Sequence, residues 1–75
     1  MNKQRRKEIA KAIGLIEQAR EILDAVKEEE QEAFDNLPEN LQNSERGETM
    51  EAHISTIEDF LDELDTDNLQ EIVDA

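Results

Sequence analysis

The chain lacks cysteine, tryptophan and tyrosine, and its 75 residues include one proline, two glycines and two phenylalanines. Without cysteine there is no disulfide framework, zinc–thiolate site or thiol redox motif. No apolar run approaches the length of about 18 residues that suggests a membrane-spanning helix, so no membrane association is expected. The basic N-terminus lacks the apolar stretch of a signal peptide. We therefore expect a cytoplasmic protein with a single domain, residues 1–75.

Charge is abundant and unevenly distributed. The chain has 21 Asp and Glu residues against 8 Lys and Arg residues, a net charge of −13. Residues 1–11 carry five cations and one carboxylate, a net charge of +4, whereas residues 12–75 carry three cations and twenty carboxylates, a net charge of −17. A basic head, which consists of Lys3, Arg5, Arg6, Lys7 and Lys11, thus precedes a strongly acidic body.

The first part of the chain is predicted to form one long helix, about residues 3–36. It contains no proline and is dominated by Ala, Glu, Lys, Arg, Ile and Leu, most of which favour helix. On a wheel of about 100° per residue its apolar side chains cover an arc of about 180°. A one-sided surface helix shows an arc of only about 100°. We therefore expect this helix to contact more than one neighbour.

The residues that follow predict a connection and a second helix. Pro38 suits the first turn of a short helical segment over residues 38–42. Ser44 is a favourable N-cap for a helix at about residues 45–64. Along that helix the apolar residues are spaced 4, 3, 4 and 3, which is a heptad seam; they are Met50, Ile54, Ile57, Leu61 and Leu64.

The last apolar residues predict a third, short helix at about residues 68–74, where Asp67 and Gln70 have capping-box spacing. At 1.5 Å per residue the first helix is about 50 Å long and the second about 30 Å, which leaves an overhang of about 20 Å in a hairpin. The short helix can fold onto that overhang, close to the basic head. The predicted fold is thus all-α, an antiparallel helical hairpin with a short C-terminal helix.

A chain of this length buries a thin core. The wide apolar arc of the first helix therefore predicts homodimerisation into a four-helix bundle. The residues assigned to the core seam or to self-association are Ile9, Ile13, Ile16, Leu23, Met50, Ile54, Ile57, Leu61 and Leu64.

Nothing in the chain predicts catalysis. His53 is the only histidine and has no paired-His or H-E-x-x-H pattern. The segment 65–68 opens like a calcium loop, but Leu69 and Gln70 stand where such a loop needs Asp or Asn and then Gly. A thin hairpin also offers no desolvated pocket for a carboxylate pair. No catalytic residue, metal or cofactor is expected.

One carboxylate falls inside the apolar arc of the first helix. Glu30 lies between Val26 and Ala33 on the wheel, and an antiparallel hairpin brings it towards Arg46 and His53. Either the side chain reaches out to water, or it forms a polar pair that fixes the register of the helices.

The acidic body is the feature with most functional content. Rows of carboxylates on a rod can imitate duplex DNA, which carries one negative charge per about 1.7 Å, and can so bind a protein with a basic surface. A merely solvated surface is the alternative. Direct nucleic-acid binding by the basic head is disfavoured, because the body repels phosphate. The candidate partner-binding residues are Glu17, Glu21, Asp24, Glu28, Glu32, Glu51, Glu58, Asp59, Asp62 and Glu63.

Residues 32–48 read E-A-F-D-N-L-P-E-N-L-Q-N-S-E-R-G-E. With this stretch the chain resembles a family of small acidic helical proteins from Gram-positive bacteria, their phages and mobile elements. The resemblance covers most of the chain and is strongest over residues 30–50. The resemblance implies a helical hairpin and a mobile-element setting, in which such proteins are often inhibitors of host defence nucleases or regulators. The leading hypothesis is an inhibitor that acts as a nucleic-acid mimic or adaptor. The alternatives are an assembly protein that pairs through the seam of the second helix, and a regulator whose basic head touches nucleic acid.

Overall fold

The computed structural model describes residues 1–75 and is 85% helical with no strands. The chain forms α1 (Lys3–Asp35), the single turn α2 (Glu39–Gln42), α3 (Glu45–Glu63) and α4 (Asp67–Asp74). Together they make a rod of 58 × 15 × 13 Å. Its radius of gyration of 17.7 Å exceeds the value of about 11 Å for a compact domain of this length.

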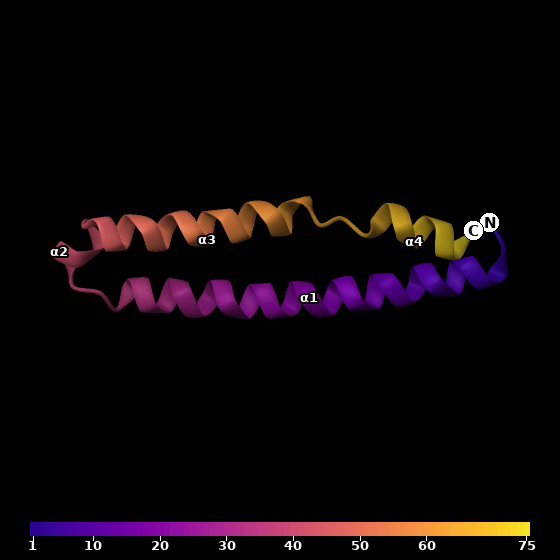
Figure 1. The fold of residues 1–75 in the computed structure, drawn as a ribbon, viewed down its shortest axis with the longest axis horizontal. Helices are drawn as coiled ribbons and strands as arrows, with labels where there is room; N and C mark the ends of the chain where they lie inside the picture. Colours follow the sequence, from indigo (N-terminus) through magenta and orange to yellow (C-terminus); the bar gives the residue numbers. More distant parts are fainter.

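The rod is a hairpin in which α1 runs along one side and α3 and α4 follow one another along the other side (Figure 1). The two chain ends therefore lie together at one end of the rod, and α2 forms the opposite tip. The predicted all-α fold and the order of its helices are confirmed, and every predicted boundary lies within one residue of the observed one.

A single heptad seam joins the two sides. The inward-facing positions of α1 are spaced alternately by three and four residues, and so are those of α3. Ile54 and Leu61, exposed by 6% and 7%, are the only buried hydrophobic side chains. The seam consists of Arg6, Ile9, Ile13, Ile16, Arg20, Leu23, Lys27, Glu30, Phe34 and Leu37 from α1 and its C-terminal end, and Gly47, Met50, Ile54, Ile57, Leu61 and Leu64 from α3 and its C-cap.

The tip of the hairpin is held by short-range hydrogen bonds. The Gln42 amide donates to the carbonyl oxygens of Phe34 and Leu37, at 3.1 and 3.2 Å, and so caps the end of α1. The Ser44 hydroxyl accepts from the Gly47 N–H at 3.4 Å, which confirms Ser44 as the N-cap of α3. A Cβ on Gly47 would lie 2.1 Å from the Gln42 carbonyl oxygen, so only glycine allows this close approach.

The start of α4 differs from the prediction. The helix begins at Asp67 with Thr66 as N-cap, and no side chain caps it. The Asp67 N–H donates instead to the Asp65 carboxylate at 2.9 Å. The predicted Asp67–Gln70 capping box is therefore wrong, because Asp67 lies inside the helix and Gln70 donates to Asp74.

None of the helices combines the length and the hydropathy that crossing a lipid bilayer requires.

Candidate functional site

The hairpin has two unlike broad faces, one on each side of the seam. In an antiparallel pair of helices the positions that directly precede the seam residues share one face, and those that directly follow them share the other. The grooves of the structure agree with this rule. One groove joins Val26 with His53 and Thr56, and a groove on the other side joins Asp24 with Glu58 and Asp62.

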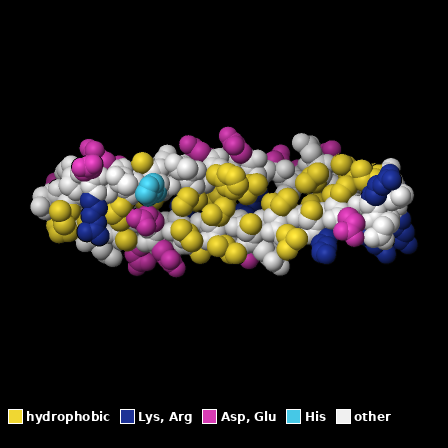
Figure 2. All heavy atoms as spheres, viewed as in Figure 1, with side chains coloured by type: hydrophobic (Ala, Val, Ile, Leu, Met, Phe, Trp, Pro, Cys, Tyr) yellow, Lys and Arg dark blue, Asp and Glu magenta, His cyan; other side chains and the backbone are white.

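One of the two broad faces, which we call the apolar face, carries small and hydrophobic side chains. Figure 2 shows hydrophobic side chains along the middle of this face over both sides of the hairpin, with most carboxylates at its edges. Negative charge on it comes from Glu8, Glu29 and Glu63, and from Glu30 of the seam, which lines the groove beside Val26 and His53. We define the apolar face by Ala12, Leu15, Ala19, Ile22, Val26 and Ala33 on α1, and His53, Thr56 and Phe60 on α3.

The second, the acidic face, carries ten carboxylates in two rows. The rows lie on neighbouring antiparallel helices and contain no Lys or Arg between their first and last members. The acidic face consists of Glu17, Glu21, Asp24, Glu28 and Asp35 on α1, and Glu48, Glu51, Glu58, Asp62 and Asp65 along α3 and the turn that follows it.

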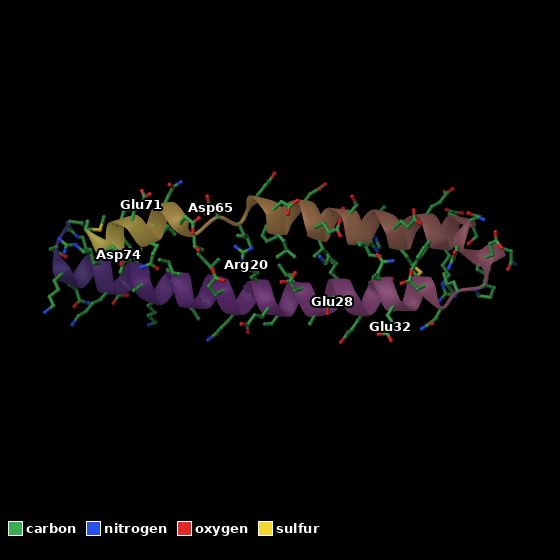
Figure 3. All side chains as sticks on the ribbon, turned by 180° about the vertical axis from the view of Figure 1, so that it is seen from behind. Arg20, Glu28, Glu32, Asp65, Glu71 and Asp74 are labelled. Carbon is green, nitrogen blue, oxygen red and sulfur yellow. The ribbon has the colours of Figure 1, made fainter.

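Seven of the ten predicted partner-binding carboxylates lie together on the acidic face, and three lie elsewhere. Glu32 and Asp59 lie on the outer edges of α1 and α3, and Glu32 points away from the opposite helix (Figure 3). Glu63 borders the apolar face. The sequence pattern did not single out Asp35, Glu48 and Asp65, which complete the two rows. The seven are Glu17, Glu21, Asp24, Glu28, Glu51, Glu58 and Asp62.

The two cations beside the acidic face are both engaged. The Arg20 guanidinium lies 3.5 Å from the Glu17 carboxylate, and the Lys27 amine lies 3.8 Å from the Glu58 carboxylate. These are the two ion pairs of the chain. The other eight carboxylates of the acidic face are therefore not neutralised by the protein itself.

Arg20 also links the two sides of the hairpin that carry the acidic face. It points from α1 towards the turn between α3 and α4 (Figure 3). It donates to the carbonyl oxygens of Leu61, at 3.4 Å, and of Leu64. Glu17, its ion-pair partner, accepts a hydrogen bond of 3.1 Å from the Thr66 hydroxyl. This network attaches the end of α3 and the start of α4 to the middle of α1.

Of the two alternatives for Glu30, the polar pair with Arg46 or His53 does not form. Glu30 is half-buried in the seam and lines a groove with Val26 and His53, but it makes no ion pair with Arg46 or His53. Of the two readings of Glu30, the structure thus favours a side chain that reaches the solvent. No group of three or more His, Asp or Glu side chains is arranged to hold a metal ion.

The basic head meets the end of the chain. The Arg6 guanidinium donates to the backbone oxygen of Ala75 at 3.0 Å and to that of Met1 at 2.6 Å. Arg5, Lys7 and Lys11 remain exposed without an ion pair. The expectation that α4 folds back towards the basic head is therefore confirmed.

No protein-family model matches the chain, and no curated protein or solved structure matches it either. Its class is defined by its geometry alone, as an antiparallel helical hairpin with one apolar and one acidic face.

Proposed function

We propose that this chain is a non-enzymatic binding protein that occupies the basic nucleic-acid-binding site of another protein, with its acidic face in the place of the phosphate backbone. The observation that carries the proposal is the sorting of ten carboxylates onto one face in two rows. Only Glu17 and Glu58 among them are paired with a cation.

The dimensions of the acidic face support mimicry. From Glu17 to Asp35 the row on α1 advances by 18 residue steps, or about 27 Å at 1.5 Å per step. Ten carboxylates over that length give about one per 3 Å, against one charge per about 1.7 Å of duplex DNA. Packed helices lie about 8–10 Å apart, a separation between the widths of the two grooves of B-DNA, about 6 and 12 Å. A cleft that binds two phosphate strands can therefore contact both rows.

The one-sided distribution of charge favours a binding face over a merely solvated surface. Solubility requires charge but no particular arrangement of it. Here ten carboxylates lie on one broad face, while the opposite face carries Glu8, Glu29, Glu63 and the groove-lining Glu30. A selective distribution of this kind is what recognition of a basic cleft requires.

The resemblance of residues 30–50 to small acidic proteins of phages and mobile elements suggests the biological setting. The proposed partner is a host nucleic-acid-binding complex, such as a defence nuclease, which the acidic face inhibits. An assembly protein is the alternative. In this structure Met50, Ile57 and Leu61 pack against α1 of the same chain, so assembly requires a surface other than that seam.

The test is capture of host proteins on the tagged chain, followed by elution with a short DNA duplex. A partner held by its nucleic-acid-binding site is released by the duplex. It is also released as salt rises from about 0.1 to 1 M, since the screening length falls from about 10 to 3 Å. We expect the eluted partner to be a nucleic-acid-binding protein whose activity the purified chain inhibits.

Two matched sets of substitutions distinguish the effect of where the carboxylates lie from the effect of the total charge of the chain. Glu21→Lys, Glu28→Lys and Glu51→Lys reverse three carboxylates of the acidic face, and the control reverses Glu32, Asp59 and Glu71, which lie off it. Each set adds six charge units and changes the net charge from −13 to −7. Loss of capture in the first set alone supports the proposal. Equal capture by both sets contradicts it.

A further inference from the structure

The apolar face is uncovered in the single chain. Leu15, Ile22 and Phe60 are exposed by 57%, 65% and 52%. The chain exposes 5746 Å², about 1,000 Å² more than the value of about 4,700 Å² expected for a compact protein of its mass. A standard protein–protein interface covers about 800 Å² on each partner. One further layer on the apolar face would therefore cover an area comparable to this excess.

The apolar face has a heptad pattern of its own. On α1 the residues Ala12, Leu15, Ala19, Ile22 and Val26 are spaced 3, 4, 3 and 4, directly beside the seam. Two adjacent heptad stripes are expected on a helix that packs against two other helices, as in a bundle. The single chain supplies a partner for only one of these stripes.

The order of residue sizes favours self-pairing of α1 in the antiparallel direction. When Ala12 lies opposite Ile22 of a second copy, Leu15 lies opposite Ala19, and the symmetric contacts repeat both pairs. Leu15 and Ile22 then each meet an alanine, and such alternation of large and small side chains fills a helix interface without voids or clashes.

Charge favours the same direction. The stretch Glu28–Glu32 contains four carboxylates at one end of α1, and the basic head lies at the other end. Antiparallel pairing places the basic head of each copy beside the Glu28–Glu32 stretch of the other. Parallel pairing places like charges together, which is unfavourable. The apolar face carries few carboxylates. Two chains of net charge −13 therefore repel each other least when they approach through this face.

We propose that a second copy of this chain covers the apolar face, with the two α1 helices antiparallel about a two-fold axis. Closed two-fold pairing is the commonest arrangement of identical chains. Both acidic faces point outward from such a dimer. The inference does not depend on the partner proposed above, because it concerns the opposite side of the hairpin.

Sedimentation equilibrium of the full chain tests the proposal. We expect twice the chain mass of 8.6 kDa. The variant Leu15→Glu with Ile22→Glu places two carboxylates on the apolar face and should sediment at the mass of one chain. The control Gln18→Glu with Ala25→Glu adds the same charge at the same spacing on the outer edge of α1 and should stay dimeric. A wild-type chain of single mass, or a dimeric Leu15→Glu, Ile22→Glu variant, overturns the proposal.

A distance measurement keeps the proposal testable if that variant loses its helices. The chain has no cysteine, so Gln4→Cys provides a single site for a spin label. With Ala12 opposite Ile22 of the second copy, residue 4 lies opposite residue 30, so the two labels are about 40 Å apart at 1.5 Å per residue. A label separation below about 20 Å, as in a parallel pair, overturns the antiparallel arrangement.

Discussion

Arg20, near the middle of α1, donates a hydrogen bond of 3.4 Å to the backbone carbonyl oxygen of Leu61 on α3. The same guanidinium donates to Leu64 and is held by Glu17. The last carbonyls of a helix have no partner within it. One cation of the seam thus satisfies the end of α3 and determines where the chain turns towards α4.

Replacing Arg20 with methionine should loosen α4 more than the rest of the hairpin. Arg20→Met keeps an apolar side chain in the seam and removes the donors. A hydrogen bond to a charged group contributes about 1.5–3 kcal/mol, and the partial exposure of Arg20 reduces this, so we expect a loss of about 1–2 kcal/mol. Denaturant unfolding measures the loss, and faster amide exchange over residues 67–74 locates it. Arg46→Met, which removes an exposed Arg without a hydrogen bond, should change neither quantity.

The two glycines should respond to alanine in opposite directions. Gly47→Ala forces a Cβ onto the Gln42 carbonyl and should destabilise the tip by more than about 2 kcal/mol. Gly14 lies within α1 with open space where a Cβ would stand, so Gly14→Ala should stabilise the chain by about 1 kcal/mol. Thermal unfolding of both variants tests this. A stabilised Gly47→Ala variant would mean that α2 and α3 are not in close contact.

Most of the helix boundaries could be predicted from local signals. Pro38 and Ser44 act through their own backbone geometry and hydrogen bonds, which neighbours in the sequence determine. The cap of α4 was predicted wrongly because the side chain that accepts at its start belongs to Asp65, two residues before the residue expected to cap. A short acidic turn offers several such acceptors, and the backbone path selects one of them.

The acidic face should destabilise the fold that carries it. Glu17, Glu21, Asp24 and Glu28 follow one another at helical spacings of three and four, and each such like-charge pair costs about 0.2–0.5 kcal/mol. Raising salt from about 0.1 to 1 M should therefore raise the unfolding midpoint. Glu21→Gln, Glu28→Gln and Glu51→Gln together should raise it at low salt and reduce its salt dependence. Neutralising Glu32, Asp59 and Glu71 should do so less.

Stability should depend on protein concentration. Because the proposed dimer buries the apolar face only when two chains meet, the thermal midpoint should rise as the chain concentration rises. The Leu15→Glu, Ile22→Glu variant should unfold at a midpoint independent of concentration. Calorimetry over a hundredfold range of concentration measures this. A wild-type midpoint that stays constant would contradict association through this face.

The faces themselves were only partly predictable. On a wheel the seam and the apolar face of α1 merge into one arc of about 180°, because their positions differ by a single residue. Separating them requires the side on which α3 packs. The seam of α1 was further obscured by Arg6, Arg20, Lys27 and Glu30, which occupy heptad positions without being apolar. Sorting the carboxylates into rows depends on the same packing direction.

The meeting of both chain ends at one end of the rod has a mechanical consequence (Figure 1). A force that pulls the two ends apart acts across the hairpin and not along it. It first loads the contact between Arg6 and Ala75, and then the Arg20 hydrogen bonds at the end of α3. The contacts break one after another instead of sharing the load. The hairpin should therefore unzip at low force, although the same helices pulled lengthwise past each other would resist.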